Sequence, residues 1–269
     1  WLLERWTRQF GNRQAEQMAK AALEEPARYI RLRPGESPPE GLTLAETDVA
    51  GCFRVTGGDY KNLRLQDIGS QAIIPLLGLH QGQSYLDLCA APGNKTRQAL
   101  EVGIRAVACD VSSRRLRQVP AICPRVVLDA TRPLPFRQRF DRILIDAPCS
   151  GTGTIGRNPE IKWRVQPQDL IRLQEKQVDI LKCGLEQLVP GGVLVYATCS
   201  LEIEENEEVV RRALDEKQEV RLVREIRRLP GREPGDGFYA AVLTSGNSAI
   251  PGQELVCADA ETGDAPLRP

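Results

Sequence analysis

Residues 84–97, SYLDLCAAPGNKTR, decide the fold. The segment begins as an apolar, strand-like run, passes through a loop that contains Gly93, and continues as a helix. In open α/β sheets, a glycine-containing loop at the first strand-to-helix turn is the position where a nucleotide binds. The segment therefore predicts the first βαβ unit of a Rossmann-like sheet.

Further apolar runs follow this unit and are separated by helical or loop segments. They cover residues 105–110, 125–130, 142–148, 192–198 and 237–243. Strands that are spaced by helical crossovers pair in parallel. We therefore predict an α/β fold with a mostly parallel sheet flanked by helices.

The first 60 residues have a different pattern. They hold an amphipathic helical stretch, a connector rich in proline and glycine, and a strand-like piece, at residues 13–23, 33–41 and 51–55. We predict a small N-terminal α+β lobe at 1–60, followed by the sheet domain at 61–245. The residues at 246–269 are polar and small, which is typical of a flexible tail.

Composition excludes several classes of function. The 269 residues carry 36 Lys and Arg against 36 Asp and Glu, so no net charge attracts nucleic acid. The only histidine, His80, lies in a turn-like segment, which disfavours Ser-His-Asp and Cys-His hydrolases and zinc sites with several histidines. Eight cysteines without a CxxC pair are typical of free thiols in a reducing compartment. We expect no metal.

No apolar run reaches the roughly 20 residues that cross a bilayer, and the first residues resemble no signal peptide. We therefore expect a cytoplasmic monomer without a membrane partner. Because Trp1 stands where an initiator methionine would, we also expect the natural chain to begin earlier.

Charge is segregated locally along the chain. In residues 155–164, IGRNPEIKWR, Trp163 lies between two cations. A base can stack on such a ring while the cations hold phosphate, so we expect this segment to contact RNA. The basic run at 112–117 and the acidic run LEIEENEEVV at 201–210 are expected to be solvated faces.

Cys149 and Cys199 each follow an apolar strand-like run and each precede a serine. Cysteine is most often a buried core residue. Chemistry in open α/β sheets, however, collects outside the carboxyl ends of the strands. Two thiols from two strand ends can therefore share one crevice, as a redox pair or as nucleophiles.

Four aspartates also end successive predicted strands, namely Asp87, Asp110, Asp129 and Asp146. Asp110 follows Asp87 by 23 positions, where a carboxylate can accept hydrogen bonds from a ribose. A rim of carboxylates repels pyrophosphate, which favours a cationic adenosine compound without phosphate. S-adenosylmethionine fits that description.

Three runs together resemble the RNA (cytosine-5)-methyltransferases of the Sun family, bacterial ribosomal-RNA branch. They are LDLCAAPGNKT at 86–96, DAPCSGTGTIGRNPEIKW at 146–163 and YATCSLEIEENE at 196–207. The resemblance extends over nearly the whole chain. It implies a Rossmann-like methyltransferase fold, and an RNA-binding role for the N-terminal lobe. Asn94 stands where the family usually has glycine.

The resemblance implies that Cys199 attacks carbon 6 of cytosine and that Cys149 helps to resolve the covalent adduct. Asp146 is expected to hydrogen-bond the cytosine ring. Lys95 can contact the methionine carboxylate of the cofactor or Asp146. The residues expected at S-adenosylmethionine, and at its product S-adenosylhomocysteine, are Cys89, Ala90, Ala91, Pro92, Gly93, Asn94, Lys95, Asp110, Arg115, Asp129 and Asp146.

The leading hypothesis is methyl transfer to carbon 5 of a cytosine in RNA, with 16S ribosomal RNA as the favoured substrate. Transfer RNA is the alternative substrate. A non-catalytic RNA-binding assembly factor and a small-molecule methyltransferase are the alternative classes of protein.

Overall fold

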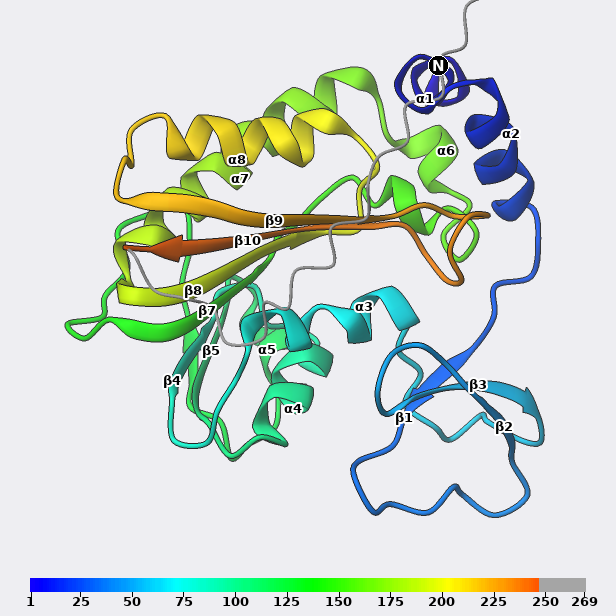
Figure 1. Cartoon of the computed structure of the whole chain (residues 1–269), viewed down its shortest axis with the longest axis horizontal. Coiled ribbons are helices and arrows are strands. Elements are labelled where there is room, and N and C mark those ends of the chain that lie inside the picture. Colours follow the sequence, from blue (N-terminus) through cyan, green and yellow to red (C-terminus); the bar gives the residue numbers. More distant parts are fainter. Residues whose placement is uncertain (247–269) are drawn as a thin grey trace, which may run out of the picture.

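A computed structural model describes residues 1–246 of the chain. Its main feature is a seven-stranded sheet with the strand order β6-β5-β4-β7-β8-β10-β9 (Figure 1). The predicted tail at 246–269 falls almost wholly outside the described residues. Within them, no helix is long and apolar enough to cross a membrane.

Five strands of this sheet are parallel, as the sequence pattern predicts. They are β4 (Ser84–Asp87), β5 (Arg105–Asp110), β6 (Arg125–Val127), β7 (Phe140–Asp146) and β8 (Leu188–Thr198). The last predicted strand, β10 (Phe238–Ser245), is antiparallel and lies between β8 and β9. The edge strand β9 (Val220–Arg228) was not predicted, because charged residues interrupt its apolar pattern.

Helices cover both faces of the sheet (Figure 1). On one face are the helices α7 (Pro167–Glu186) and α8 (Glu207–Leu214), and on the other are α3 (Ile68–Ala72), the 3-10 helix η1 (Ile74–Leu77), α4 (Asn94–Leu100) and α5 (Ser113–Leu116). The N-terminus of α7 follows the sequence signal. Pro167 occupies its first turn, and the side chains of Gln166 and Asp169 form a reciprocal capping box.

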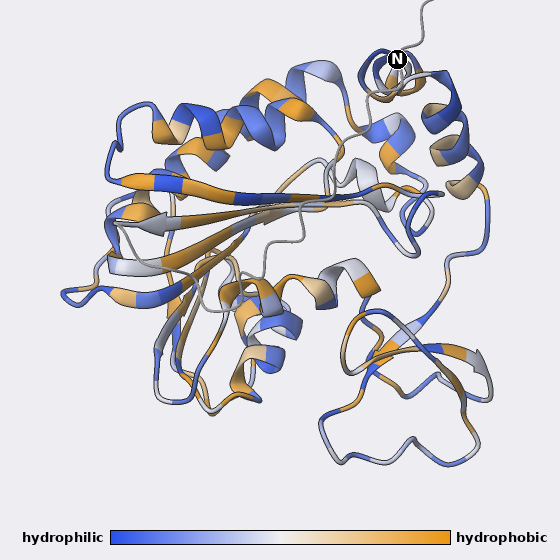
Figure 2. Ribbon diagram, viewed as in Figure 1, coloured by the Kyte–Doolittle hydropathy of each residue, from blue (hydrophilic) through white to orange (hydrophobic). Residues whose placement is uncertain are grey.

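Apolar side chains fill the layers between the sheet and its helices. Leu86, Ile143 and Leu194 belong to the cluster that includes α7 and α8, whereas Tyr85, Leu144 and Val195 belong to the cluster on the opposite face. Neighbouring residues of one strand thus enter opposite cores, as strand geometry requires. Figure 2 shows this concentration of apolar residues in the central strands. A core on both faces holds the strand ends rigidly.

The first 60 residues form two packing groups. The helices α1 (Leu2–Phe10) and α2 (Asn12–Ala21) share an apolar cluster with α6 (Ile161–Arg164) and Leu201. They begin earlier than the helix predicted at 13–23. A separate antiparallel sheet contains β1 (Tyr29–Arg31), β2 (Thr43–Glu46) and β3 (Cys52–Gly57), and its core includes Ile68 of α3. Figure 1 shows these two groups at opposite ends of the segment that joins them.

Candidate active site

The two cysteines meet at the carboxyl edge of the parallel strands. The neighbouring strands β7 and β8 pair Asp146 with Ala197, so the chain leaves the sheet at the same level in both. The loops that follow bring the Sγ atoms of Cys149 and Cys199 to 3.2 Å from each other. The expected shared crevice is therefore present, and both cysteine residues are half-buried at its edge.

The two thiols form a hydrogen bond in which either sulfur can be the donor. The hydrogen bond with Cys199 and the burial of the thiol raise the pKa of Cys149 well above its usual value. A thiol with a raised pKa stays protonated at neutral pH, so Cys149 can donate its S–H to the sulfur of Cys199. In that arrangement the sulfur of Cys199 is the acceptor of the pair.

A single buried carboxylate, that of Glu205, joins the two cysteine loops. It accepts hydrogen bonds from the backbone N–H of Ser150 at 2.8 Å and from the hydroxyl of Ser200 at 2.5 Å. The Ser150 hydroxyl and the amide of Gln177, at 3.0 Å, also donate to it. Since each serine directly follows one of the cysteines, Glu205 fixes the positions of both thiols.

Burial raises the pKa of Glu205, while its hydrogen bonds oppose this rise. The expectation that residues 201–210 form a solvated face is wrong for Glu202, Glu205 and Asn206, which are fully buried. The acidic composition of the run suggested exposure. The serine that follows each cysteine is the sequence feature that could have indicated a buried hydrogen-bond acceptor nearby.

Glu202 ties the second cysteine loop to the N-terminal helix α1. Its carboxylate accepts hydrogen bonds from Arg5 Nε at 2.8 Å and Trp6 Nε1 at 3.1 Å. Arg5 also pairs with Glu204. Because Glu202 lies three residues after Cys199, α1 supports the position of that loop.

Asp146 lies at the end of β7, and Lys95 of α4 holds its carboxylate. The Nζ atom of Lys95 is 2.7 Å from Asp146 Oδ2 and 2.9 Å from the hydroxyl of Ser70. Of the two contacts expected for Lys95, the structure therefore shows the one with Asp146. The side chain of Asp146 remains one-third exposed, so it can also meet a ligand.

A cavity of about 330 Å³ opens beside the cysteines. Its walls include Cys149, Cys199 and the strand-end carboxylates of Asp110, Asp129 and Asp146. Of the other residues expected to bind the cofactor, Cys89, Ala91, Pro92 and Arg115 also line it. A cavity of this size can hold a nucleoside-sized ligand.

A smaller cavity of about 110 Å³ lies next to it and shares Asp146 with it. It is lined by Ala90, Asn94 and Lys95, and also by Asp87. One carboxylate oxygen of Asp87, Oδ1, is buried without a hydrogen-bond partner. The other oxygen accepts from the hydroxyl of Thr96 at 2.7 Å. The burial of Asp87 raises its pKa to about 7.

Gly93 shapes the loop instead of lining either cavity. It has a φ of 97°, and an added Cβ would lie 2.9 Å from the Cα atom of Val119. The loop is also held from outside, because Ala91 donates its N–H to Asp110 at 3.2 Å and accepts from Arg115 at 2.7 Å through its carbonyl. Asp110 and Arg115 thus both position the loop and face the cavity.

The residues present fit a cationic adenosine ligand. Three carboxylates on one wall can accept hydrogen bonds from ribose hydroxyls and attract a positive charge. The unpartnered oxygen of Asp87 adds negative potential next to this wall. A pyrophosphate would be repelled here.

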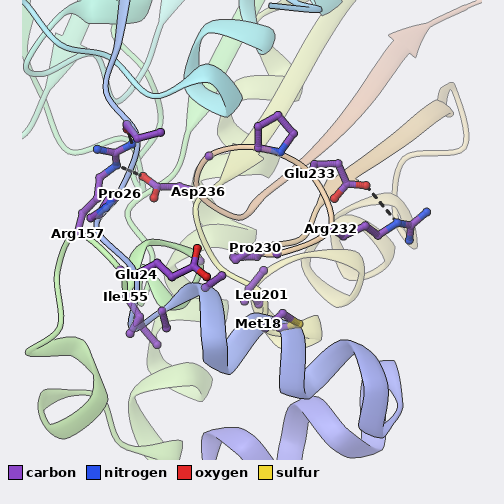
Figure 3. Close-up of a pocket in the computed structure, with 18 of the residues that line it drawn as sticks. Met18, Glu24, Pro26, Ile155, Arg157, Leu201, Pro230, Arg232, Glu233 and Asp236 are labelled. Carbon is purple, nitrogen blue, oxygen red and sulfur yellow. Dashed lines mark hydrogen bonds and ion pairs between the residues drawn. The ribbon is translucent and has the colours of Figure 1, made fainter. Parts of the chain in front are cut away.

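Another cavity, of about 380 Å³, lies elsewhere, behind the loop that follows Cys149. Figure 3 shows its walls, which include Met18, Ile155 and Leu201. Its prominent charges are already paired. Arg157 binds Asp236 at 2.7 Å, and Arg232 lies 3.3 Å from Glu233. Because this cavity has no cysteine in its walls, the cysteine cavity is the stronger candidate for the chemistry.

Two further expectations concern exposed segments. In IGRNPEIKWR, Arg157 is engaged by Asp67 and Asp236 and is therefore a structural residue. Trp163 is 73% exposed, with Lys162 Nζ 5.0 Å from its ring centre, so this end of the segment can still meet RNA. His80 is exposed, as expected. Among residues 1–246, no three His, Cys, Asp or Glu side chains gather as metal ligands would.

The parallel sheet, the glycine loop and the carboxylate-lined cavity define the class of Rossmann-like methyltransferases. The family model described as 16S rRNA methyltransferase RsmB/F matches residues 74–244. The chain belongs to this family, which confirms the resemblance drawn from its motifs.

Curated relatives agree with this assignment. Ribosomal RNA small subunit methyltransferase B of Vibrio cholerae serotype O1 is 42% identical over 67% of this chain and 45% of its own length. The protein of the same name from Erwinia tasmaniensis is 34% identical over 90% of this chain and 65% of its own length. The chain thus spans about half to two thirds of the length of these relatives.

Solved structures share the fold. A methyltransferase homologue from Pyrococcus horikoshii has a TM-score of 0.78 and 25% identity, and the match covers 90% of this chain and 93% of that one. NSun6 from the same organism, determined with SFG, has a TM-score of 0.79 at 18% identity over 92% and 98% of the two chains. The Rossmann-like architecture is therefore confirmed.

Proposed function

We propose that this chain transfers a methyl group to carbon 5 of a cytosine in RNA, with 16S ribosomal RNA as the substrate. The observation that carries the proposal is the pair of sulfur atoms 3.2 Å apart beside the carboxylate-lined cavity. The names of the relatives support the RNA class and the small ribosomal subunit.

Carbon 5 of cytosine is a weak nucleophile, and addition of a thiolate to carbon 6 makes it electron-rich. In the proposed reaction the Cys199 sulfur forms the bond to carbon 6, and the electron pair moves toward carbon 5 and the ring. Asp146 and Lys95 lie where a hydrogen bond to the ring can balance this charge. S-adenosylmethionine, when bound, supplies an electrophilic methyl group.

The covalent bond must then break. The proton on carbon 5 passes to solvent, the electron pair of the C–H bond forms the double bond between carbons 5 and 6, and the bond between carbon 6 and sulfur breaks with its electrons returning to Cys199. We propose that Cys149 assists this step, because its sulfur is adjacent to that of Cys199. The cofactor would contact Asp110, Asp129 and the loop at 89–95. A cytoplasmic monomer remains a prediction.

Two variants test the proposal with S-adenosylmethionine and naked 16S ribosomal RNA. Cys199→Ala should abolish turnover, because no other sulfur replaces the nucleophile. Cys149→Ala should accumulate a covalent protein–RNA complex, visible as a shifted band on a denaturing gel. Cys183→Ala, on helix α7 but outside the walls of the cysteine cavity, is the matched control. Normal turnover by Cys149→Ala would contradict its assigned role.

Three alternatives are outcomes of related assays. Mapping 5-methylcytosine in ribosomal and transfer RNA at single-base resolution distinguishes the two substrates. An assembly factor without catalysis would retain its function in cells carrying Cys199→Ala. A small-molecule methyltransferase would not need the exposed Trp163, so Trp163→Ala would leave its activity intact.

A further inference from the structure

A groove of about 280 Å³ lies where the small N-terminal sheet meets helix α4 (Figure 1). We call it the arginine groove, and it is lined by Arg31, Arg64, Gln66, Asn94, Arg97, Gln98 and Glu101. Arg31 is neutralised by Glu101, with Nη2 and Oε2 2.7 Å apart. The groove therefore owes its net charge to the remaining arginines.

Within residues 1–246, neither Arg64 nor Arg97 pairs with a carboxylate. Arg64 donates to the side-chain oxygen of Asn94 at 2.7 Å, and this neutral amide fixes the guanidinium without cancelling its charge. The Nε atom of Arg97 is buried and has no hydrogen-bond partner in the described part of the chain. Both groups thus have donors available for an anion.

The positive charges of neighbouring arginines act on Arg97 in the groove. Burial, together with the charges of Arg64 and Arg33, lowers the pKa of Arg97. Like charges held together in a partly buried groove are unfavourable until an anion binds between them. A phosphate group matches this need, since planar guanidinium groups bind phosphate oxygens with good geometry.

The arginine groove adjoins the candidate active site through one residue. Asn94 lines both the groove and the small cavity that contains Lys95 and Asp146. That cavity in turn shares Asp146 with the cysteine cavity. The positive charge of the groove thus lies one residue away from the cavities that lead to Cys199.

We propose that the arginine groove binds the sugar-phosphate backbone of the RNA strand that carries the target cytosine. This inference rests on the proposed function, since it assumes an RNA strand at the cysteine cavity. Phosphate contacts of this kind fix the register of a strand and carry no sequence information. The groove would position the strand, while the cysteine cavity selects the base.

Binding of a fluorescent 20-nucleotide oligouridylate tests the groove separately from the chemistry, because this probe has a backbone but no cytosine. For single strands, the slope of log affinity against log salt concentration changes by about 0.7 for each phosphate contact. Arg64→Gln and Arg97→Gln should each reduce the slope by about that amount and weaken binding about three- to tenfold at 0.1 M salt. Arg211→Gln, on the exposed face of α8, is the matched control and should match the wild type.

Both variants remove like-charge repulsion, so we expect them to fold, which thermal unfolding checks. With 16S ribosomal RNA as substrate, the KM for RNA should rise while kcat and the affinity for S-adenosylmethionine stay unchanged. An unchanged salt slope in both variants would overturn the proposal. Loss of S-adenosylmethionine affinity, or equally tight binding of uridine monophosphate and the oligomer, would also overturn it. A wild type that binds oligouridylate but methylates no RNA would defeat the proposed function and support the groove.

Discussion

Glu205 shows how one side chain can control two others that it does not touch. Its carboxylate contacts the serines after both cysteines, so the distance between the thiols depends on these hydrogen bonds. It is a positioning residue, because it acts through Ser150 and Ser200. No property of an isolated acidic residue in the sequence reveals this role.

Replacement of Glu205 by Gln should lower kcat and change the KM for RNA little. The amide replaces one acceptor oxygen with an N–H donor. This donor faces the groups that already donate to Glu205, from Ser150, Ser200 and Gln177, at a cost of about 1–3 kcal/mol. We expect kcat to fall by about tenfold or more, which corresponds to about 1.4 kcal/mol in the barrier. Steady-state kinetics measure this change, and Glu216→Gln in the exposed turn after α8 is the control.

The positioning role of Glu205 also predicts a change in the reactivity of the two thiols. If the loops separate, iodoacetamide should alkylate Cys149 and Cys199 faster in folded Glu205→Gln than in the wild type. Mass spectrometry of the labelled peptides measures both rates. Unchanged alkylation together with unchanged kcat would contradict the positioning role.

Asp87 should make stability depend on pH. Its pKa is about 7 in the folded chain and about 3.8 when unfolded, so the folded state holds the extra proton between these values. Stability from this group is therefore present at low pH and is lost as the pH rises to about 7. Between pH 5 and 8 the loss is about 2–3 kcal/mol.

Asp87→Asn should remove this component of the pH dependence. Urea denaturation of wild type and variant at pH 5 and pH 8, without cofactor, measures the difference. Asp141→Asn is the control, because the hydrogen bond with Ser84 lowers the pKa of Asp141 and places its titration below pH 5. An equal change with pH in wild type and Asp87→Asn would show that Asp87 is ionised throughout.

At the scale of elements, helix α1 supports the loop that carries Cys199. Arg5→Met should destabilise the protein by about 3 kcal/mol, because Glu202 would remain buried without its ionic partner. The second substitution Glu202→Leu should restore part of the loss. Urea denaturation measures each variant.

Arg8→Met provides the matched control on the same helix. Arg8 is exposed and contacts only the carbonyl of Glu4 in the described residues, so we expect a change within about 0.5 kcal/mol. Equal stability of Arg5→Met and Arg8→Met would show that water reaches Glu202 and that α1 does not support the loop.

Elements with a strong periodic pattern were predictable. The parallel strands and the shared crevice of the two cysteines were predictable because the apolar runs end directly before the cysteine loops, at Asp146 and Thr198. The edge strand β9 was missed, since its exposed face carries arginine and glutamate. The buried acids Glu202 and Glu205 were also missed, because burial of a carboxylate depends on distant donors such as Arg5 and Gln177.

At the scale of the whole molecule, the two N-terminal groups of the described chain differ in role. One supports the cysteine loop, and the other borders the groove proposed for RNA. Helices α1 and α2 pack on the sheet domain and stabilise the cysteine loop, whereas the small sheet borders the arginine groove. The sequence suggested one lobe at 1–60 because both groups are short and polar. Their different contacts arise from tertiary packing, which no local pattern records.

The strand order also constrains how the protein is made. β10 is the last strand of the described chain, yet it lies inside the sheet next to β8, the strand that leads into Cys199. Gly237, at the entry to β10, donates its N–H to Gly153 at 2.8 Å, and Gly153 donates to the carbonyl of Cys199 at 2.9 Å. A chain emerging from the ribosome therefore lacks an ordered nucleophile until its final strand is synthesised. We therefore expect chains that end before β10 to transfer no methyl group.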